Sequence, residues 1–159
     1  MQQWVEQIAR RLQARGWMLA TAESCTGGWV AQELTALAGS SNWFDCGFVT
    51  YSNAAKARML GVSPAVIESE GAVSEAVVRA MAEGAVRHSD ARVAVSISGI
   101  AGPGGGSALK PVGTVWFGWA CEGQPTQAQC HRLAGDREAV RRQAVEIALR
   151  GVLGMLGQG

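Results

Sequence analysis

The chain has 159 residues, of which 48% are hydrophobic and 17% are charged, and its formal net charge is +1. This length suits one domain with a single buried core. Ordinary hydrophobicity with a near-zero net charge excludes a disordered chain, and the lack of a Lys/Arg block disfavours a strongly basic nucleic-acid binder. Only two of the 14 cationic residues are lysines, Lys56 and Lys110, and both lie inside motifs described below.

No segment predicts export or membrane insertion. The N-terminal segment carries Glu6 and no apolar run, and no stretch reaches the ~18 apolar residues of a membrane span. The four cysteines form no CxxC pair and have no metal-ligand spacing, so we expect no metal site. Cys121 and Cys130 could face each other across a hairpin, but we expect reduced thiols and a cytoplasmic protein.

The predicted elements follow from apolar periodicity and from capping and turn residues. In the first half of the chain we expect helix 2–15, strand 17–21, a helix from the glycines at 27–28 to Ala38, and strand 43–52. Two short helices are expected next, one over 53–60 and one from Pro64 to about residue 70. A longer helix capped by Ser74 and running to about Ser89 follows, and then strand 92–98. The last elements are strands 112–121 and 127–133, paired as a hairpin, and a final helix capped by Asp136.

Strands alternate with helices along most of this order. That alternation predicts an α/β fold in which helices cover a sheet. The closing hairpin adds antiparallel strands, so the sheet is expected to be mixed. Since no linker or repeat interrupts the pattern, we expect residues 1–159 to form one three-layer α/β/α domain.

The first motif is the segment Thr21-Ala22-Glu23-Ser24-Cys25-Thr26-Gly27-Gly28, at a predicted strand-to-helix junction. Such a junction exposes backbone N–H groups and the positive end of a helix dipole, which can stabilise an oxyanion or a phosphate. Ordinary helix capping by Ser24 or Thr26 explains the same residues about as well. Position alone does not decide whether Ser24 or Cys25 is the nucleophile.

The second motif is Thr50-Tyr51-Ser52-Asn53-Ala54-Ala55-Lys56, where a predicted strand turns into a helix. A lysine near a serine can act as a general base if burial lowers its pKa, and a tyrosine can assist proton transfer. Arginine could not replace the lysine as a base, so a lysine at this position is mildly informative in this arginine-rich chain. The alternative is that Lys56 is a solvated surface residue.

The third motif is the glycine-rich segment 99–107, followed by Lys110-Pro111-Val112-Gly113-Thr114. A loop of this kind offers backbone donors to an anion. It matches neither the GxxxxGK[ST] pattern nor a dinucleotide fingerprint. Nine residues with five glycines exceed the needs of a simple turn, so a ligand-facing loop is favoured over a flexible surface loop.

Together the three motifs resemble the CinA C-terminal domain family, whose enzymatic members are nicotinamide-nucleotide amidases. The resemblance also includes Leu60-Gly61-Val62 and Gly135-Asp136-Arg137 with Arg141, and it covers most of the chain. It implies a domain that hydrolyses the carboxamide of nicotinamide mononucleotide to nicotinic acid mononucleotide and ammonia, recycling pyridine nucleotides without a cofactor. The family's larger members carry a further N-terminal domain, and this chain looks like the stand-alone form.

The resemblance also implies roles for single residues. Ser24 is the expected nucleophile, Lys56 its base, and Tyr51 a residue that relays or orients. Cys25 remains a rival nucleophile, since a helix N-terminus could lower its pKa, and backbone N–H groups from Cys25 to Gly27 would hold the oxyanion. We expect substrate contacts from Cys25, Thr26, Gly27, Ser98, Gly102, Gly104, Gly105, Thr114, Arg137 and Arg141. Lys110 could steer phosphate or hold the loop.

Two other functions compete with the amidase. A catalytically silent member of the family could bind a pyridine nucleotide without hydrolysing it, although a pure binder needs no nucleophile and base. A regulatory partner in competence or DNA-damage responses is disfavoured because the basic residues are scattered. The six tryptophans exceed the usual needs of one small core, so we expect a homodimer or a higher homo-oligomer.

Overall fold

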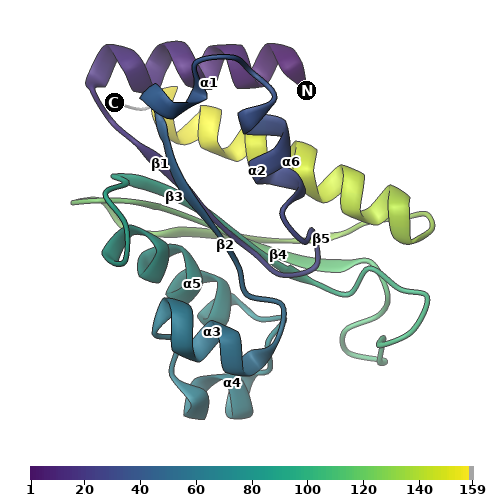
Figure 1. Cartoon of the computed structure of the whole chain (residues 1–159). Helices are drawn as coiled ribbons and strands as arrows, with labels where there is room; N and C mark the ends of the chain where they lie inside the picture. Colours follow the sequence, from purple (N-terminus) through teal and green to yellow (C-terminus); the bar gives the residue numbers. More distant parts are fainter. Residues whose placement is uncertain (158–159) are drawn as a thin grey trace.

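The computed structural model describes residues 1–157 and shows one sheet with helices on both faces (Figure 1). The strands are β1 Leu19–Glu23, β2 Phe44–Val49, β3 Val93–Gly99, β4 Thr114–Cys121 and β5 Gln127–Arg132. The helices are α1 Gln2–Arg15, α2 Trp29–Thr35, α3 Asn53–Leu60, α4 Pro64–Glu70, α5 Glu75–Arg87 and α6 Arg137–Gly157, with a short 3-10 turn η1 Ser40–Asn42. The predicted α/β/α architecture with a mixed sheet is confirmed.

The strand order of the sheet is β2-β1-β3-β4-β5. Strands β1, β2 and β3 are parallel, whereas β4 runs antiparallel to β3 and pairs with β5 in the expected hairpin. The carboxyl ends of β1, β2 and β3 therefore share one edge of the sheet with the start of β4 and the end of β5. All three sequence motifs follow strands that end at this edge.

Each face of the sheet is covered by its own set of helices. Helices α1, α2 and α6 lie on one face, and α3, α4 and α5 lie on the other (Figure 1). The helices bury apolar stripes, such as Val140, Ala144 and Val152 on α6 and Val77 and Met81 on α5. Burying these side chains against the sheet supplies the main stabilisation of the fold.

The sequence misplaced the ends of several elements by two or three residues. Strand β1 begins at Leu19 and continues to Glu23 because it pairs with β3 over that whole range. Strand β2 stops at Val49, since the Ser52 hydroxyl accepts a hydrogen bond from the Ala55 N–H and so begins α3. Helix α2 ends at Thr35 rather than at Ala38.

The predicted caps of α5 and α6 are confirmed. The Ser74 hydroxyl accepts from the Val77 N–H, and the Asp136 carboxylate accepts from the Ala139 N–H at 2.9 Å. Each bond satisfies a donor of the first helical turn.

The four cysteines all lie within the described residues and are free thiols. The suggested facing of Cys121 and Cys130 is wrong, because the hairpin register places Cys130 opposite Trp116. Within residues 1–157 no cluster of side chains could hold a metal ion. None of the helices in the same range is long and apolar enough to cross a membrane.

Candidate active site

The site lies at the edge of the sheet where the three parallel strands end. The segment from Ser24 to Gly28 follows β1, and the segment from Thr50 to Ser52 connects β2 to α3. Parallel pairing of β1 with β2 brings these two segments together. The carboxyl ends of parallel strands are the usual place for a site in an α/β sheet.

The side chains of Ser24 and Lys56 meet although 32 positions separate them in the chain. The Lys56 side-chain nitrogen Nζ lies 3.0 Å from Ser24 Oγ, and it donates to the backbone carbonyls of Thr50 at 3.0 Å and Tyr51 at 3.2 Å. Lys56 is only 1% exposed and Ser24 is 8% exposed. Lys56 is therefore not the solvated surface residue that the sequence left open.

Burial lowers the pKa of Lys56 from its ordinary value of 10.5, because a charged amine loses its hydration inside the protein. The contacts of Nζ suit the neutral form as well. A neutral amine has two N–H donors and one lone pair, so the Thr50 and Tyr51 carbonyls can accept both hydrogens while the lone pair faces the Ser24 hydroxyl. This arrangement allows Lys56 to remove the proton of Ser24.

The pKa of the neighbouring Cys25 thiol is shifted in the opposite direction. Cys25 is buried, and burial raises its pKa to about 11 although Arg141 and Lys56 favour the thiolate. The expectation that a helix N-terminus could lower this pKa is wrong, because loss of solvent outweighs the nearby positive charges. A thiol that stays protonated is a poor nucleophile, so the buried surroundings of Cys25 favour Ser24 as the nucleophile.

The segment between β1 and α2 is anchored by Glu23, a residue for which the sequence had suggested no role. Its carboxylate is fully buried and accepts hydrogen bonds from the Thr26 hydroxyl at 2.6 Å, the Val30 N–H at 2.9 Å and the Ala31 N–H at 3.0 Å. Glu23 thus satisfies the first turn of α2, a function expected of Ser24 or Thr26. Gly28 occupies the N-cap position instead, with φ 103° and no side-chain bond.

The backbone donors of this segment are unequally available. The Gly27 N–H donates to the Ser24 carbonyl at 3.0 Å, so it is engaged in a turn. Among the described residues, the Thr26 N–H, like those of Cys25 and Gly28, has no backbone or side-chain acceptor. Arg141 binds the carbonyl groups of the same segment, since its Nε donates to the Cys25 carbonyl at 3.0 Å and its Nη2 to the Thr26 carbonyl at 3.2 Å.

Arg137 connects the glycine-rich loop to the second motif. Its Nη1 donates to the Gly102 carbonyl at 2.8 Å and its Nη2 to the Tyr51 hydroxyl at 3.1 Å. Arg137 and Tyr51 are both exposed, Tyr51 by 58%. The Tyr51 side chain therefore lies beside Arg137, and only the backbone carbonyl of Tyr51 contacts Lys56.

The remaining predicted residues fall into two groups. Ser98 and Thr114 are buried, and their hydroxyls donate to the carbonyls of Ala72 and Pro111. Gly104 and Gly105 lie exposed in the loop. The substrate contacts expected of all four stay predictions.

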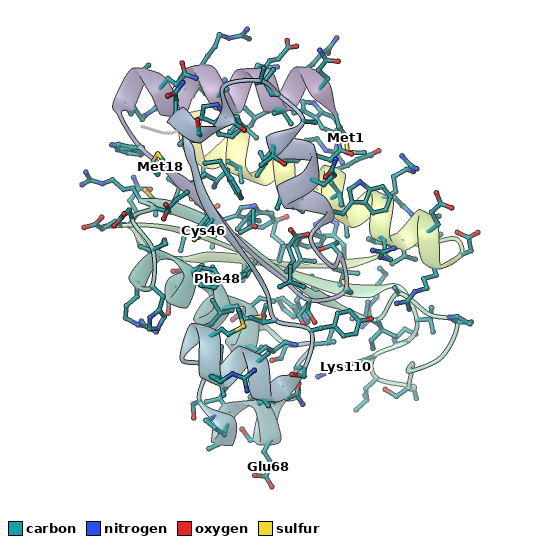
Figure 2. The ribbon with its side chains drawn as sticks, viewed as in Figure 1. Met1, Met18, Cys46, Phe48, Glu68 and Lys110 are labelled. Atoms are coloured by element: carbon teal, nitrogen blue, oxygen red, sulfur yellow. The ribbon has the colours of Figure 1, made fainter. Side chains whose placement is uncertain are left out.

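Lys110 holds the glycine-rich loop against the layer of helices formed by α3, α4 and α5. Its Nζ donates to the Glu70 carbonyl at the end of α4 at 2.9 Å, and Figure 2 shows the side chain between the loop and that layer. This contact agrees with the holding role that the sequence suggested as one of two alternatives.

Comparison with known proteins gives a consistent result. A model of the CinA C-terminal domain matches residues 1–156. The nicotinamide-nucleotide amidohydrolase PncC of Escherichia coli K12 is 57% identical over 152 residues, covering 94% of this chain and 91% of that protein. The PncC protein of Pseudomonas putida is 54% identical, with 85% and 84% covered.

Solved structures agree with the sequence relatives. A CinA superfamily protein from Klebsiella pneumoniae has a TM-score of 0.94 and 43% identity, with 99% of this chain and 98% of that chain covered. A CinA superfamily protein from Escherichia coli has a TM-score of 0.93 and 40% identity, with 97% and 89% covered. Sequence and fold together show that this chain belongs to the CinA C-terminal domain family.

Proposed function

We propose that the chain is a nicotinamide-nucleotide amidohydrolase that converts nicotinamide mononucleotide to nicotinic acid mononucleotide and ammonia. The observation that carries the proposal is the buried Lys56 amine 3.0 Å from Ser24 Oγ. The PncC relatives are named for this activity. A nucleophile paired with a buried base is a combination that a nucleotide-binding module does not need.

In the first half of the reaction Ser24 Oγ attacks the carboxamide carbon while Lys56 Nζ takes the hydroxyl proton. A tetrahedral intermediate forms, and its oxyanion is stabilised by backbone N–H donors of the segment after β1. When the C–N bond breaks, Lys56 returns the proton to the leaving nitrogen, which departs as ammonia. The substrate then remains as an ester on Ser24.

In the second half a water molecule attacks this ester. Lys56 accepts a proton from the water and passes it to Ser24 Oγ as the C–O bond breaks. The product leaves as the carboxylic acid, which ionises to nicotinate and releases its proton to the solvent, and the enzyme is restored. Each proton taken up by Lys56 is returned within the same half-reaction, so no cofactor is required.

The phosphate of the substrate is proposed to bind beside the glycine-rich loop. Arg137 is exposed there and uses two of its five N–H donors on Gly102 and Tyr51. Gly104 and Gly105 leave backbone groups open to a ligand. Tyr51, next to Arg137, offers a ring that can pack on the cationic pyridinium.

Comparing two alanine variants tests the nucleophile. Ser24→Ala should lose essentially all ammonia release, because no neighbouring group replaces the hydroxyl, whereas Cys25→Ala should stay within a few-fold of the wild-type kcat. Ammonia is measured with nicotinamide mononucleotide as substrate. Full activity in Ser24→Ala would refute the Ser–Lys assignment, and binding without turnover in the wild-type protein would favour the silent-module alternative.

The surroundings of the enzyme are proposed on broader grounds. The 14 cationic and 13 acidic residues are balanced, which supports a protein that binds no nucleic acid. The free thiols support a protein that works in the reducing cytoplasm. The proposed homodimer or higher homo-oligomer rests on the number of tryptophans. Sedimentation velocity checks that assembly, and a monomer at micromolar concentration would contradict it.

A further inference from the structure

Arg141 does not have the contacts of a residue awaiting a phosphate. Two of its guanidinium nitrogens donate to consecutive backbone carbonyls, those of Cys25 and Thr26. The guanidinium also lies 5.5 Å from the centre of the Trp29 ring. These partners hold Arg141 against the segment that follows Ser24, whereas Arg137, one turn earlier on α6, contacts the glycine-rich loop.

The two carbonyls belong to peptide groups whose N–H ends matter for the reaction. The Cys25 carbonyl shares its peptide plane with the Thr26 N–H, which has no acceptor among the described residues. The Thr26 carbonyl shares its plane with the Gly27 N–H, which is used in the turn to Ser24. Fixing the two carbonyls therefore fixes the direction of the Thr26 N–H.

The same segment is also held by an anion. The buried Glu23 carboxylate binds the Thr26 hydroxyl and the N–H groups of Val30 and Ala31. A cation thus binds the carbonyl ends of the segment while an anion binds its hydroxyl and the helix that follows. Charge-assisted hydrogen bonds of this kind are stronger than neutral ones, so the backbone between them has little freedom.

We propose that Arg141 is a positioning residue that aims the Thr26 N–H at the oxyanion formed when Ser24 attacks the amide. Its positive charge also draws electron density toward the Cys25 carbonyl, which makes the N–H of that peptide a better donor. The inference rests on the proposed amidase function. It assigns Arg141 to the transition state rather than to the substrate phosphate.

The neighbouring Arg142 provides a matched control. Arg142 lies on the same helix and over the same Trp29 ring, at 5.1 Å, but its hydrogen bond goes to the exposed Glu138 carboxylate at 3.3 Å. Replacing either arginine by Met removes a cation and a ring contact of the same kind. Only the Arg141 change removes hydrogen bonds to the backbone of the segment from Ser24 to Gly28.

Steady-state kinetics on nicotinamide mononucleotide separate the two roles of Arg141. Removing an oxyanion donor lowers kcat by about 10²–10³-fold in other enzymes, so losing its support in Arg141→Met should lower kcat by about tenfold or more, with KM nearly unchanged. Arg141→Lys, which keeps the charge but cannot span both carbonyls, should fall between wild type and Met. Arg142→Met should keep the wild-type kcat.

A covalent probe supplies a readout that needs no phosphate contact. A fluorophosphonate labels an active serine through a tetrahedral adduct that uses the oxyanion donors, and mass spectrometry follows its attachment to Ser24. Labelling of Arg141→Met should slow in parallel with kcat. Circular dichroism and melting curves show whether the variant is folded, and if it is not, Arg141→Lys carries the test.

The outcomes distinguish this inference from the proposed function. A raised KM with an unchanged kcat and an unchanged labelling rate in Arg141→Met would assign Arg141 to substrate binding and overturn the inference. Equal kcat losses in the Arg141→Met and Arg142→Met variants would also overturn it, since the shared Trp29 contact would then explain them. A wild-type protein that neither releases ammonia nor is labelled at Ser24 would instead contradict the proposed function.

Discussion

At the scale of single residues, Lys56 combines two demands that usually conflict. It is almost fully buried, and its amine still contacts three oxygen atoms. Burial without partners would be costly, whereas an ion pair with a carboxylate would keep the amine charged. Carbonyl and hydroxyl partners satisfy the donors without adding a negative charge, which leaves the pKa of Lys56 lowered.

The pH dependence of the rate follows from this environment. A general base works in its neutral form, so kcat/KM should rise with pH and level off once the pH exceeds the pKa of Lys56. Because burial lowers that pKa, the rise should be centred below 10.5, the ordinary value for lysine. Ammonia release measured across pH, together with a stability check at each pH, tests the prediction.

Variants at this position should confirm which group titrates. Lys56→Met should lower kcat/KM by about 10²–10⁴-fold, the usual contribution of a general base, and remove the rise with pH. Arg58→Met on the same helix α3, which changes an exposed cation, is the control and should keep both rate and profile. A pH profile that Lys56→Arg leaves unchanged would refute the base role.

At the scale of elements, α6 shows how closely a helix must approach the sheet. Two glycines lie one turn apart on its C-terminal half. A Cβ at Gly151 would overlap the indole of Trp119 on β4, whereas a Cβ at Gly154 would meet no atom within 4 Å. The Trp119 indole N–H also donates to the Ala148 carbonyl of α6 at 3.1 Å, so the ring is held in place.

Alanine at these two glycines should have opposite effects on stability. Gly154→Ala should raise the free energy of unfolding by about 0.5–1 kcal/mol, because alanine loses less conformational entropy in a helix. Gly151→Ala should lower it by about 1–3 kcal/mol, the usual cost of overpacking a core. Urea unfolding followed by circular dichroism measures both, and a stabilising Gly151→Ala would contradict the close packing.

The β1–α2 junction is the other element on which the site depends. Glu23 is the last residue of β1, and its carboxylate accepts hydrogen bonds from the first turn of α2, so the segment between the two elements is anchored at both ends. The sequence placed a strand and a helix here correctly, and Ser24 as the nucleophile stays a prediction. It did not reveal Glu23 as the anchor, because an acidic residue beside a serine carries no information about whether its carboxylate is buried.

At the scale of the whole molecule, the site draws on segments that span most of the chain. Glu23, Lys56, Gly102 and Arg141 come from four regions that meet only because their strands and helices are layered around one sheet (Figure 1). Because the helices on both faces pack against one mixed sheet, we expect no part of the domain to unfold independently of the rest. The activity should therefore depend on the integrity of the entire chain.

Unfolding should accordingly occur in a single transition, as predicted for one domain over residues 1–159. Tryptophan fluorescence reports on the tertiary surroundings of six residues, including Trp4 and Trp29 on helices and Trp116 and Trp119 on β4, while far-ultraviolet circular dichroism reports on all helices and strands. The two signals should give the same midpoint in urea, as small single domains usually do. Separate midpoints would contradict the single-domain prediction.

The sequence by itself determined the order of elements, the mixed α/β class and the motif residues, because periodicity and capping are local properties of the chain. Only the tertiary structure decided which of those residues act together. Parallel pairing of β1 with β2 placed Lys56 Nζ against Ser24 Oγ, and burial then set the opposite pKa shifts of Lys56 and Cys25. The packing of α6 directed Arg137 toward Tyr51 and Arg141 toward the segment that follows Ser24. Distances and desolvation arise from contacts between distant segments, so no local pattern contains them.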